Sequence, residues 1–169
     1  VVGSVDVYKR QEFLKKNVFD NIKYRSSSED FIGRFYGEFM RYSGGDGQTL
    51  GIVLTPRHIC DLFCDLLDIK ATDIVLDPCC GTAGFLVAAM HHMLEKAGAD
   101  QNKRKNIKKK QLHGFELQSN MFAIAATNMI LRDDGNSNIK CEDFLRQNPA
   151  QVQLKGATVG TVSYTHLRA

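Results

Sequence analysis

The sequence lacks three features, and each absence excludes a class of protein. It contains no apolar run near the ~18 residues that a membrane-spanning helix needs, and no secretory leader precedes its first polar segment. Its five cysteines are odd in number and follow no disulfide-like spacing. We therefore expect a protein without membrane contact that works in a reducing cytoplasm.

Metal-binding patterns and a strong net charge are also absent. The cysteines form no Cys-x-x-Cys pair and the histidines no paired spacing, so we predict no metal site. We expect Cys79 and Cys80 to be small buried residues in a turn. With 22 Lys and Arg against 19 Asp and Glu, the net charge of +3 permits contact with nucleic acid without arguing for it. The 169 residues, 43% of them hydrophobic, suffice for one globular core.

What the sequence does contain is a glycine turn between a predicted strand and a predicted helix. The apolar run 74–76 is followed by Asp77-Pro78-Cys79-Cys80-Gly81-Thr82-Ala83-Gly84 and then by an apolar segment. Gly81 and Gly84 let the backbone approach a ligand, and the helix behind them directs its free N–H groups at that ligand. Asp77 ends the strand, and its acceptor-only carboxylate suits a hydroxyl or ammonium donor. The turn does not identify the ligand, although the absence of a G-x-G-x-x-G triple argues against a dinucleotide.

Apolar periodicity predicts the helices. They are expected over Glu12–Tyr24, Asp30–Tyr42, Leu86–Lys96 and Ser119–Leu131, and another begins with Thr55 as its cap and Pro56 in its first turn. Two of them have defined apolar faces, formed by Ile59, Leu62, Phe63, Leu66 and Leu67 after Pro56, and by Phe122, Ala125, Ala126, Met129 and Ile130 in the last helix. Asn102–Lys110 is interpreted as a basic surface loop, with contact to nucleic-acid phosphates as the alternative.

Short apolar runs predict a parallel sheet with carboxylates along one edge. Strands are expected at Asp73–Leu76, Leu112–Glu116 and Ile139–Cys141, with a fourth at Ala157–Val159. Asp77, Glu116 and Asp143 lie at the ends of the first three strands, which share one edge of a parallel sheet. A carboxylate after the second strand can accept from both ribose hydroxyls of an adenosine cofactor, and one after the third from the adenine amino group. For Asp143 the alternative is an ordinary loop carboxylate.

The glycine turn and three flanking segments together resemble a known family. With Leu54-Thr55-Pro56-Arg57 before the turn, and Gly114-Phe115-Glu116 and Asn128-Met129 after it, the sequence resembles the modification (methyltransferase) subunit of type I restriction-modification systems. The resemblance extends from about Asp30 to about Gly160. One departure is visible, because the family has glycine where this chain has Ala83, and the extra methyl group is tolerable unless the residue needs a positive φ.

The resemblance implies a fold, a cofactor, an activity and partners. The implied fold is α/β, a Rossmann-like class I S-adenosylmethionine-dependent methyltransferase with a partial parallel sheet, preceded by the end of an N-terminal helical domain. The implied activity is transfer of a methyl group from S-adenosyl-L-methionine to adenine N6 in DNA, in a complex with a specificity subunit and a restriction subunit. The implied cofactor contacts are Thr55, Pro56, Arg57, Asp77, Gly81, Thr82, Ala83, Gly84, Glu116 (ribose) and Asp143 (adenine).

The catalytic tetrapeptide of such enzymes is not found in the sequence. These families use Asn/Asp-Pro-Pro-aromatic after the fourth strand to hold the amino group of a flipped adenine. The only candidate, Asn148-Pro149-Ala150-Gln151, lacks the second proline and the aromatic residue and precedes the fourth strand, so we reject it. We expect the tetrapeptide just beyond Gly160, and we therefore predict a fragment that does not methylate DNA.

The two ends of the chain resemble translated adapter sequence. We expect residues 1–11 and 162–169 not to be native, residues 12–48 to be the end of a helical domain with its linker, and residues 49–161 to be the N-terminal part of a methyltransferase domain. Two other functions remain open: a methyltransferase that acts on RNA or protein, and a non-catalytic subunit that binds an adenosine ligand or serves assembly.

Overall fold

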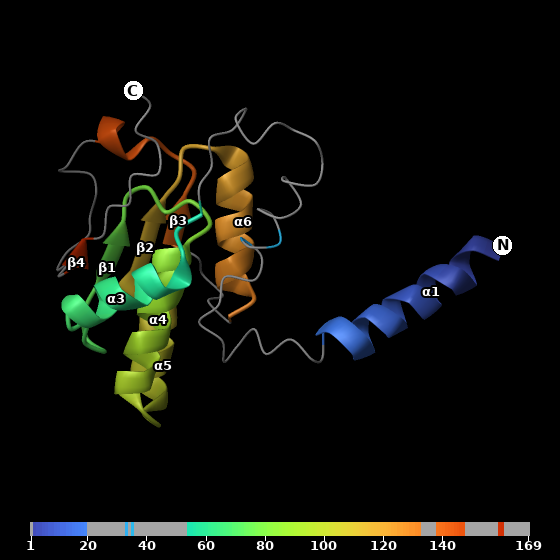
Figure 1. Ribbon diagram of the computed structural model, residues 1–169, viewed down its shortest axis with the longest axis horizontal. Coiled ribbons are helices and arrows are strands. Elements are labelled where there is room, and N and C mark those ends of the chain that lie inside the picture. The colour runs from blue at the N-terminus through green and yellow to red at the C-terminus, as the bar shows by residue number, and fades with distance from the viewer. Residues whose placement is uncertain are drawn as a thin grey trace.

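The structure, a computed structural model, describes residues 2–19, 33, 35, 54–132, 138–147 and 159–160 of the chain (Figure 1). Its helices are α1 (Val2–Leu14) with a π-helical extension (Lys15–Phe19), α3 (Arg57–Leu66), α4 (Gly84–Ala97), α5 (Gln101–Asn106) with a π-helical extension (Ile107–Gln111), α6 (Ser119–Ile130) and a 3-10 turn (Phe144–Arg146). Its strands are β1 (Val75–Asp77), β2 (Leu112–Phe115), β3 (Asn138–Lys140) and β4 (Val159–Gly160). The helix predicted over 30–42 lies outside the described residues, except for positions 33 and 35.

The four strands form one parallel sheet in the order β3-β2-β1-β4. Asp77 of β1 is in register with Gly114 of β2, and Phe115 of β2 with Lys140 of β3. Parallel neighbours need a crossover connection, and α4 with α5 and then α6 lie in the two crossovers from β1 to β2 and from β2 to β3. The ends of β1, β2 and β3 therefore lie at one edge of the sheet (Figure 1), and the first three predicted strands are confirmed to within two residues.

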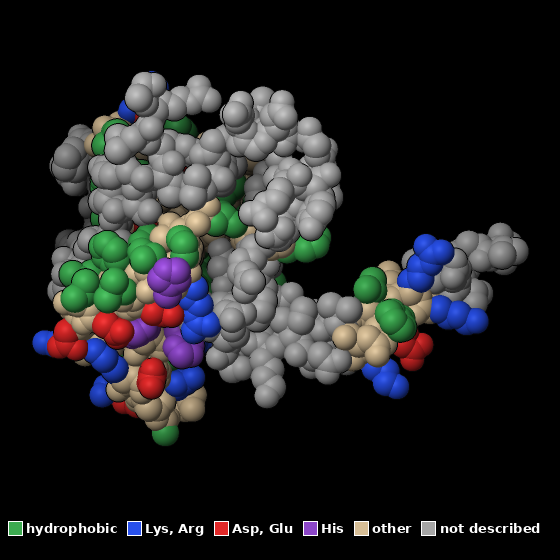
Figure 2. All heavy atoms as spheres, viewed as in Figure 1, with side chains coloured by type: hydrophobic (Ala, Val, Ile, Leu, Met, Phe, Trp, Pro, Cys, Tyr) green, Lys and Arg blue, Asp and Glu red, His purple; other side chains and the backbone are tan. Residues whose placement is uncertain are grey.

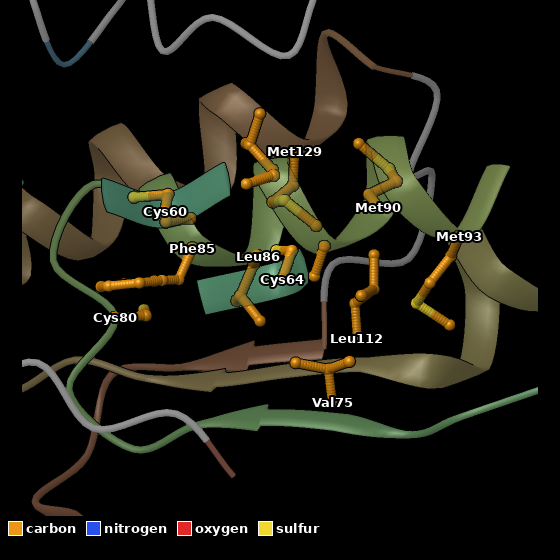
Figure 3. Packing of buried hydrophobic residues seen from close by; sticks show 14 of the residues in the cluster. Cys60, Cys64, Val75, Cys80, Phe85, Leu86, Met90, Met93, Leu112 and Met129 are labelled. Atoms are coloured by element: carbon orange, nitrogen blue, oxygen red, sulfur yellow. The ribbon is translucent and has the colours of Figure 1, made fainter. Parts of the chain in front are cut away.

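Helix α4 is the centre of the core because it is apolar on nearly all sides. Residues 85–90 are all buried, which an amphipathic surface helix would not show. The helix contacts β1 and β2 as well as α3, and Leu86, Met90 and Met93 lie between these layers (Figure 3). Burying each such side chain contributes roughly 1.5–3 kcal/mol. The predicted helix over 86–96 is confirmed, with its start two residues earlier.

Gly114 in β2 packs closely against Cys80 of the glycine turn and Leu86 of α4. A Cβ atom at this position would lie 2.9 Å from Leu86 Cδ1 and 3.0 Å from Cys80 Sγ, so a larger residue would force one of these side chains to move. Cys80 is buried as predicted, whereas Cys79 is exposed, so the prediction for Cys79 is wrong. Burial alternates along the turn, because Cys80 faces β2 and α4 while Cys79 points away from them.

The apolar face predicted for α3 is not the face that the helix buries. Leu62, Phe63 and Leu66 are exposed, Leu66 by 73%, and the residues of α3 that are buried are Cys60 and Cys64. The small cysteine side chains allow α3 to lie close to α4, and this rotates the leucines outward. Hydrophobic side chains accordingly gather over α3 on the face shown in Figure 2. The N-cap of α3 is Pro56 rather than Thr55, one residue later than predicted.

The basic loop predicted over 102–110 is wrong, because these residues form α5 and its extension. Asp100 caps the helix by accepting from the N–H groups of Asn102 and Lys103, and Lys and Arg are good helix formers. Arg104 donates to the carbonyls of Leu94 and Gly98 at the end of α4. The segment leads into the amino end of β2, so its lysines lie at the edge of the sheet opposite the strand ends that carry Asp77 and Glu116 (Figure 1).

The helix predicted over 119–131 is confirmed as α6, but its buried face differs. Ala125 and Met129 are buried as predicted, whereas Ile130 is 59% exposed and Asn128 is fully buried. The polar Asn128 occupies this position because it has a specific partner in the glycine turn. No helix among the described residues is long and apolar enough to cross a membrane. In the same part of the chain, no group of three His, Cys, Asp or Glu side chains could hold a metal ion.

Candidate functional site

The glycine turn lies at the end of β1 and leads directly into α4. Within it, the N–H of Ala83 donates to the carbonyl of Cys80 at 2.7 Å, and Gly81 adopts a φ of +54°. Ala83 itself adopts φ +68° and ψ +27°, the left-handed conformation that costs a residue with a Cβ atom about 1–2 kcal/mol. The condition under which the family's glycine is needed therefore applies here, and the chain accommodates alanine in a strained position.

The N-terminus of α4 is open. Ala83 is its N-cap, and no side chain among the described residues caps it; the first N–H with an intrahelical partner in this turn is that of Val87, which donates to Ala83 at 2.9 Å. The N–H groups ahead of Val87 and the helix dipole favour an anionic ligand group here.

Three hydrogen bonds join the glycine turn to the next strand and helix. The N–H of Cys80 donates to the carbonyl of Phe115 at 2.9 Å. The N–H of Gly81 donates to Glu116 Oε2 at 2.9 Å, and Asn128 Nδ2 donates to the carbonyl of Thr82 at 2.8 Å. The conformation of the turn is thus set by β2 and α6 as well as by its own glycines.

Asn128 is held in turn by a buried arginine. Arg132, 2% exposed, donates from one guanidinium nitrogen to the Asn128 carbonyl at 2.8 Å and to Asn128 Oδ1 at 3.2 Å. The second bond leaves Asn128 Nδ2 facing Thr82. Sequence reasoning gave Asn128 no structural role and missed Arg132, although an asparagine three residues after Ala125, on the apolar stripe of the helix, was a usable signal for a buried polar contact.

Asp77 is the most unusual group at the site. It is 1% exposed, and its Oδ1 accepts from the N–H of Cys79 at 3.2 Å. Its Oδ2 has no hydrogen-bond donor among the described residues. Burial raises the pKa of Asp77 to about 7; the Cys79 N–H opposes this rise and the negative charge of Glu116 adds to it. The structure confirms that Asp77 lies at the end of a strand, as the sequence predicted.

Glu116 is the partly exposed carboxylate at the end of β2. Its Oε1 accepts from the N–H of Gln118 at 2.8 Å, while its Oε2 accepts from Gly81. Each oxygen keeps a second lone pair that can accept from a ligand hydroxyl. Glu116 can therefore serve a ligand and also hold the glycine turn, a second role that sequence reasoning did not anticipate.

Asp143 has an evident local role. Its Oδ1 accepts from the N–H of Leu145 at 3.0 Å and caps the 3-10 turn, and its Oδ2 lies 3.3 Å from Arg146 Nε. Even so, the structure brings it near the other two carboxylates. Burial and the charges of Asp77, Glu116 and Asp143 all raise the pKa of the exposed Cys79 thiol, so each of the three carboxylates lies near enough to Cys79 for its charge to be felt there.

The remaining predicted residues lie at the start of α3, beside the turn. A Cβ atom at Gly84 would lie 3.8 Å from Cys60 Sγ, which places the first turn of α3 next to the start of α4. Thr55 and Pro56 precede that turn of helix. Arg57 Nε donates to Asp61 Oδ2 at 3.1 Å, so its guanidinium is directed along α3 in this structure.

A small parallel α/β domain with a helix N-terminus and carboxylates at the strand ends has the architecture in which open-sheet proteins place their ligands. The sequence profile of the N-6 DNA methylases matches residues 27–160, and the chain belongs to this family. This confirms the resemblance predicted from the glycine turn and its flanking segments.

Relatives and solved structures agree with this assignment. The chain is 51% identical over 126 residues to the type II restriction enzyme and methyltransferase RM.BcgI of Heyndrickxia coagulans, covering 75% of this chain and 20% of that protein. It is 30% identical over 116 residues to the type I restriction enzyme MjaIX methylase subunit of Methanocaldococcus jannaschii, covering 68% and 19%.

The fold also matches two solved structures. A crystal structure of a restriction-enzyme modification subunit from Vibrio vulnificus YJ016 superposes with a TM-score of 0.59 at 30% identity, covering 71% of this chain and 25% of that one. A chain from a structure of the type I R-M system gives a TM-score of 0.59 at 25% identity, covering 72% and 25%. The present chain thus spans about a fifth to a quarter of the length of these proteins.

Proposed function

We propose that the chain is the cofactor-binding part of a Rossmann-like DNA methyltransferase that transfers a methyl group from S-adenosyl-L-methionine to adenine N6. The observation that carries this proposal is the glycine turn, which is tied to Glu116 and in which the buried Asp77 Oδ2 has no donor among the described residues. The strand order β3-β2-β1-β4 supports it, since Rossmann-type sheets have the order 3-2-1-4 at their centre. Membership of the N-6 DNA methylase family supports the substrate.

Each chemical group of S-adenosyl-L-methionine, the methyl donor, has residues in the site that fit it. The open N-terminus of α4, beginning at Gly84, suits the ligand's carboxylate, and Asp77 Oδ2 suits its ammonium group. Glu116 would accept from the ribose hydroxyls and Asp143 from the adenine amino group, while Thr55, Pro56 and Arg57 would contact the methionine portion. When bound, S-adenosyl-L-methionine supplies an electrophilic methyl group on a sulfonium centre.

The chain's own residues would bind and orient this donor but not activate the adenine. The lone pair of adenine N6 is delocalised into the ring, and it attacks only when acceptors hold the amino hydrogens and the flipped base is stacked. Asn148-Pro149-Ala150-Gln151, the tetrapeptide we reject, lies outside the described residues. We propose that the activating tetrapeptide follows Gly160 in the intact protein and that the present chain does not methylate DNA.

The division of the chain is also a proposal. Residues 12–48 would close an N-terminal helical domain and residues 49–161 would begin the methyltransferase domain. The family profile, which covers 27–160, supports the boundary near Gly160. Residues 1–11 and 162–169 would be non-native; the first of these segments forms most of α1.

Two assemblies are compatible with the family. In the first, the intact protein is a type I modification subunit that joins a specificity subunit and a restriction subunit on DNA in the cytoplasm. In the second, methyltransferase and restriction activities share one chain. The 51% identity to a protein named as both restriction enzyme and methyltransferase favours the second, whereas the type I solved structures favour the first.

The test of the proposed function is binding followed by transfer. Calorimetry should show that the chain binds S-adenosyl-L-methionine more tightly than NAD, and the reverse order would contradict the cofactor assignment. The chain should then be incubated with tritiated S-adenosyl-L-methionine, adenine-containing duplex DNA and a specificity subunit, beside a version extended through the next native strand and its tetrapeptide. Label on adenine N6 from the extended version alone is expected. Label from the present chain would overturn the predicted inactivity.

A further inference from the structure

Among the described residues, the surroundings of Asp77 contain acceptors and negative charge but no cation. Its Oδ1 receives one N–H, from Cys79 at 3.2 Å, and its Oδ2 receives none from the described residues. The charged group that faces it from β2 is Glu116. On its own loop, the thiols of Cys79 and Cys80 are both affected by the charge of Asp77. No lysine or arginine in the described part of the chain acts on this carboxyl group.

A carboxyl group in such a place holds a proton more firmly than usual, because burial disfavours its charged form. The pKa of Asp77 is raised to about 7, so near neutral pH the protein without ligand is a mixture of the protonated and ionised forms. An ammonium group placed at Oδ2 would shift Asp77 to its ionised form, since an opposite charge in contact favours the carboxylate.

We propose that the amino-acid end of the ligand displaces a proton from Asp77, so that the cofactor binds with net release of that proton to solvent. This proposal rests on the proposed function, because it requires an adenosine ligand that carries an ammonium group. The Oδ2–H bond breaks, the proton goes to water, and the ligand's ammonium takes its place as the donor to Oδ2. Burial, the unused oxygen and the absence of a cation in the described surroundings support this exchange.

The proposal gives a characteristic dependence on pH. With a pKa of about 7 for Asp77 in the unliganded protein, about 0.9 proton is released per ligand at pH 6. The dissociation constant is about fivefold larger at pH 6 than at pH 7. Near pH 8, binding takes up protons instead of releasing them. The free ligand's α-amino group, with an ordinary pKa of about 7.7–8.0, must then take up about half a proton to bind as ammonium.

The experiment is isothermal titration calorimetry of the full chain in buffers of different ionisation enthalpy at pH 6, 7 and 8. The probes are S-adenosyl-L-methionine and 5′-methylthioadenosine, which has the adenosine part but no ammonium group. We expect release at pH 6 and uptake at pH 8 for the first ligand, and less than about 0.2 proton at either pH for the second. Because the two ligands are compared on one unmodified chain, this test needs no variant.

Two variants locate the proton. Asp77→Asn should bind S-adenosyl-L-methionine without proton release at pH 6, and its affinity should be constant between pH 6 and 7. Asp73→Asn is the matched control, since Asp73 lies just before the amino end of β1 and accepts from the N–H of Lys70 at 2.8 Å. It should retain the proton release of the unmodified chain.

The outcomes separate this proposal from the proposed function. If S-adenosyl-L-methionine binds with no proton release at pH 6, or if Asp77→Asn still releases one, the exchange at Asp77 is wrong while the cofactor assignment stands. If 5′-methylthioadenosine releases as many protons, the ammonium group is not responsible and the proposal is overturned. If the chain binds neither ligand, the proposed function fails and this proposal falls with it.

Discussion

Glu116 and Asp143 are the same kind of residue in the same kind of place, yet they differ in what they hold together. Each is a carboxylate just past the end of a parallel strand. One oxygen of Glu116 accepts from Gly81, 35 positions earlier in the chain, whereas the partners of the Asp143 carboxylate among the described residues, Leu145 and Arg146, are its near neighbours in the chain. A strand-end carboxylate becomes part of a site when its partner comes from another strand–helix unit; otherwise it is a helix cap that can serve a ligand only secondarily.

The largest expected effect concerns Asp77, which extends this comparison. Among the described residues, its carboxylate has neither a strong local partner, as Asp143 has, nor one from a distant segment, as Glu116 has. Its folded-state pKa of about 7 lies above the ordinary value of 3.8. Between these values the folded state binds more protons than the unfolded state, so the free energy of unfolding falls as pH rises through this window. The loss from this group is of the order of 4 kcal/mol at and above pH 7.

Denaturant unfolding of the chain at pH 5, 6 and 7 measures this loss, with Asp77→Asn as the comparison. The variant keeps an acceptor for the Cys79 N–H and cannot ionise, so the difference in stability between it and the unmodified chain should grow with pH. A constant difference across the three pH values would contradict the raised pKa of Asp77.

A second prediction concerns a hydrogen bond between α6 and the glycine turn, instead of the charge of Asp77. Asn128→Ala leaves the buried Thr82 carbonyl without its donor and deprives Arg132 of one acceptor. We expect a loss of about 2–3 kcal/mol in the free energy of unfolding, together with weaker cofactor binding, measured by urea unfolding and calorimetry. The control is Thr127→Ala, an exposed neighbour on α6 whose hydroxyl donates to the Ala123 carbonyl within its own helix. Equal losses in the two variants would show that the Thr82 bond has no special weight.

A third prediction tests the dual role of Glu116. Glu116→Ala should weaken binding of S-adenosyl-L-methionine by roughly 1.5–3 kcal/mol, because the ribose loses its acceptor. Because the variant also loses the bond from the Gly81 N–H, we expect a further loss of about 1 kcal/mol in the free energy of unfolding. Glu116→Gln keeps one acceptor oxygen and should lie between the two in both measurements. Unchanged affinity in the alanine variant would place the ribose elsewhere.

The smallest effect is expected for Asp143. Asp143→Ala removes a cap from a short 3-10 turn and should cost about 0.5–1 kcal/mol in stability. Asp143→Asn retains a capping oxygen, so any loss of cofactor affinity that both variants share reports on the adenine contact and not on the cap. A loss of affinity as large as that of Glu116→Ala would remove the distinction between the two carboxylates.

The sequence predicted the elements of the sheet better than the contacts between them. The first three strands, α4 and α6 follow from local apolar runs and glycine positions, which are properties of short segments. The outward rotation of Leu62 and Leu66 on α3 could not be predicted, because periodicity shows that a helix has an apolar face but not which neighbour it meets. The helix over 101–106 was missed because high charge was taken to mean a loop, although Asp100 is a good N-cap.

At the site, sequence reasoning located the residues but not their connections. Asp77 and Glu116 were predicted from their positions after strands, and the structure places them at one edge of the sheet. The bond from Asn128 to Thr82 spans 46 positions and depends on how α6 lies against the turn. Local patterns contain no information on such a distance, so the residue appeared only as part of a family resemblance.

The three bonds that hold the glycine turn have a consequence for the entropy of binding. A free loop of this length would have to be ordered by its ligand, and fixing each residue of backbone costs roughly 1–2 kcal/mol. Here Phe115, Glu116 and Asn128 order the turn when the protein folds, and the strained Ala83 is held in the same way. The binding surface is therefore preorganised, and most of the ligand's interaction energy is available as affinity.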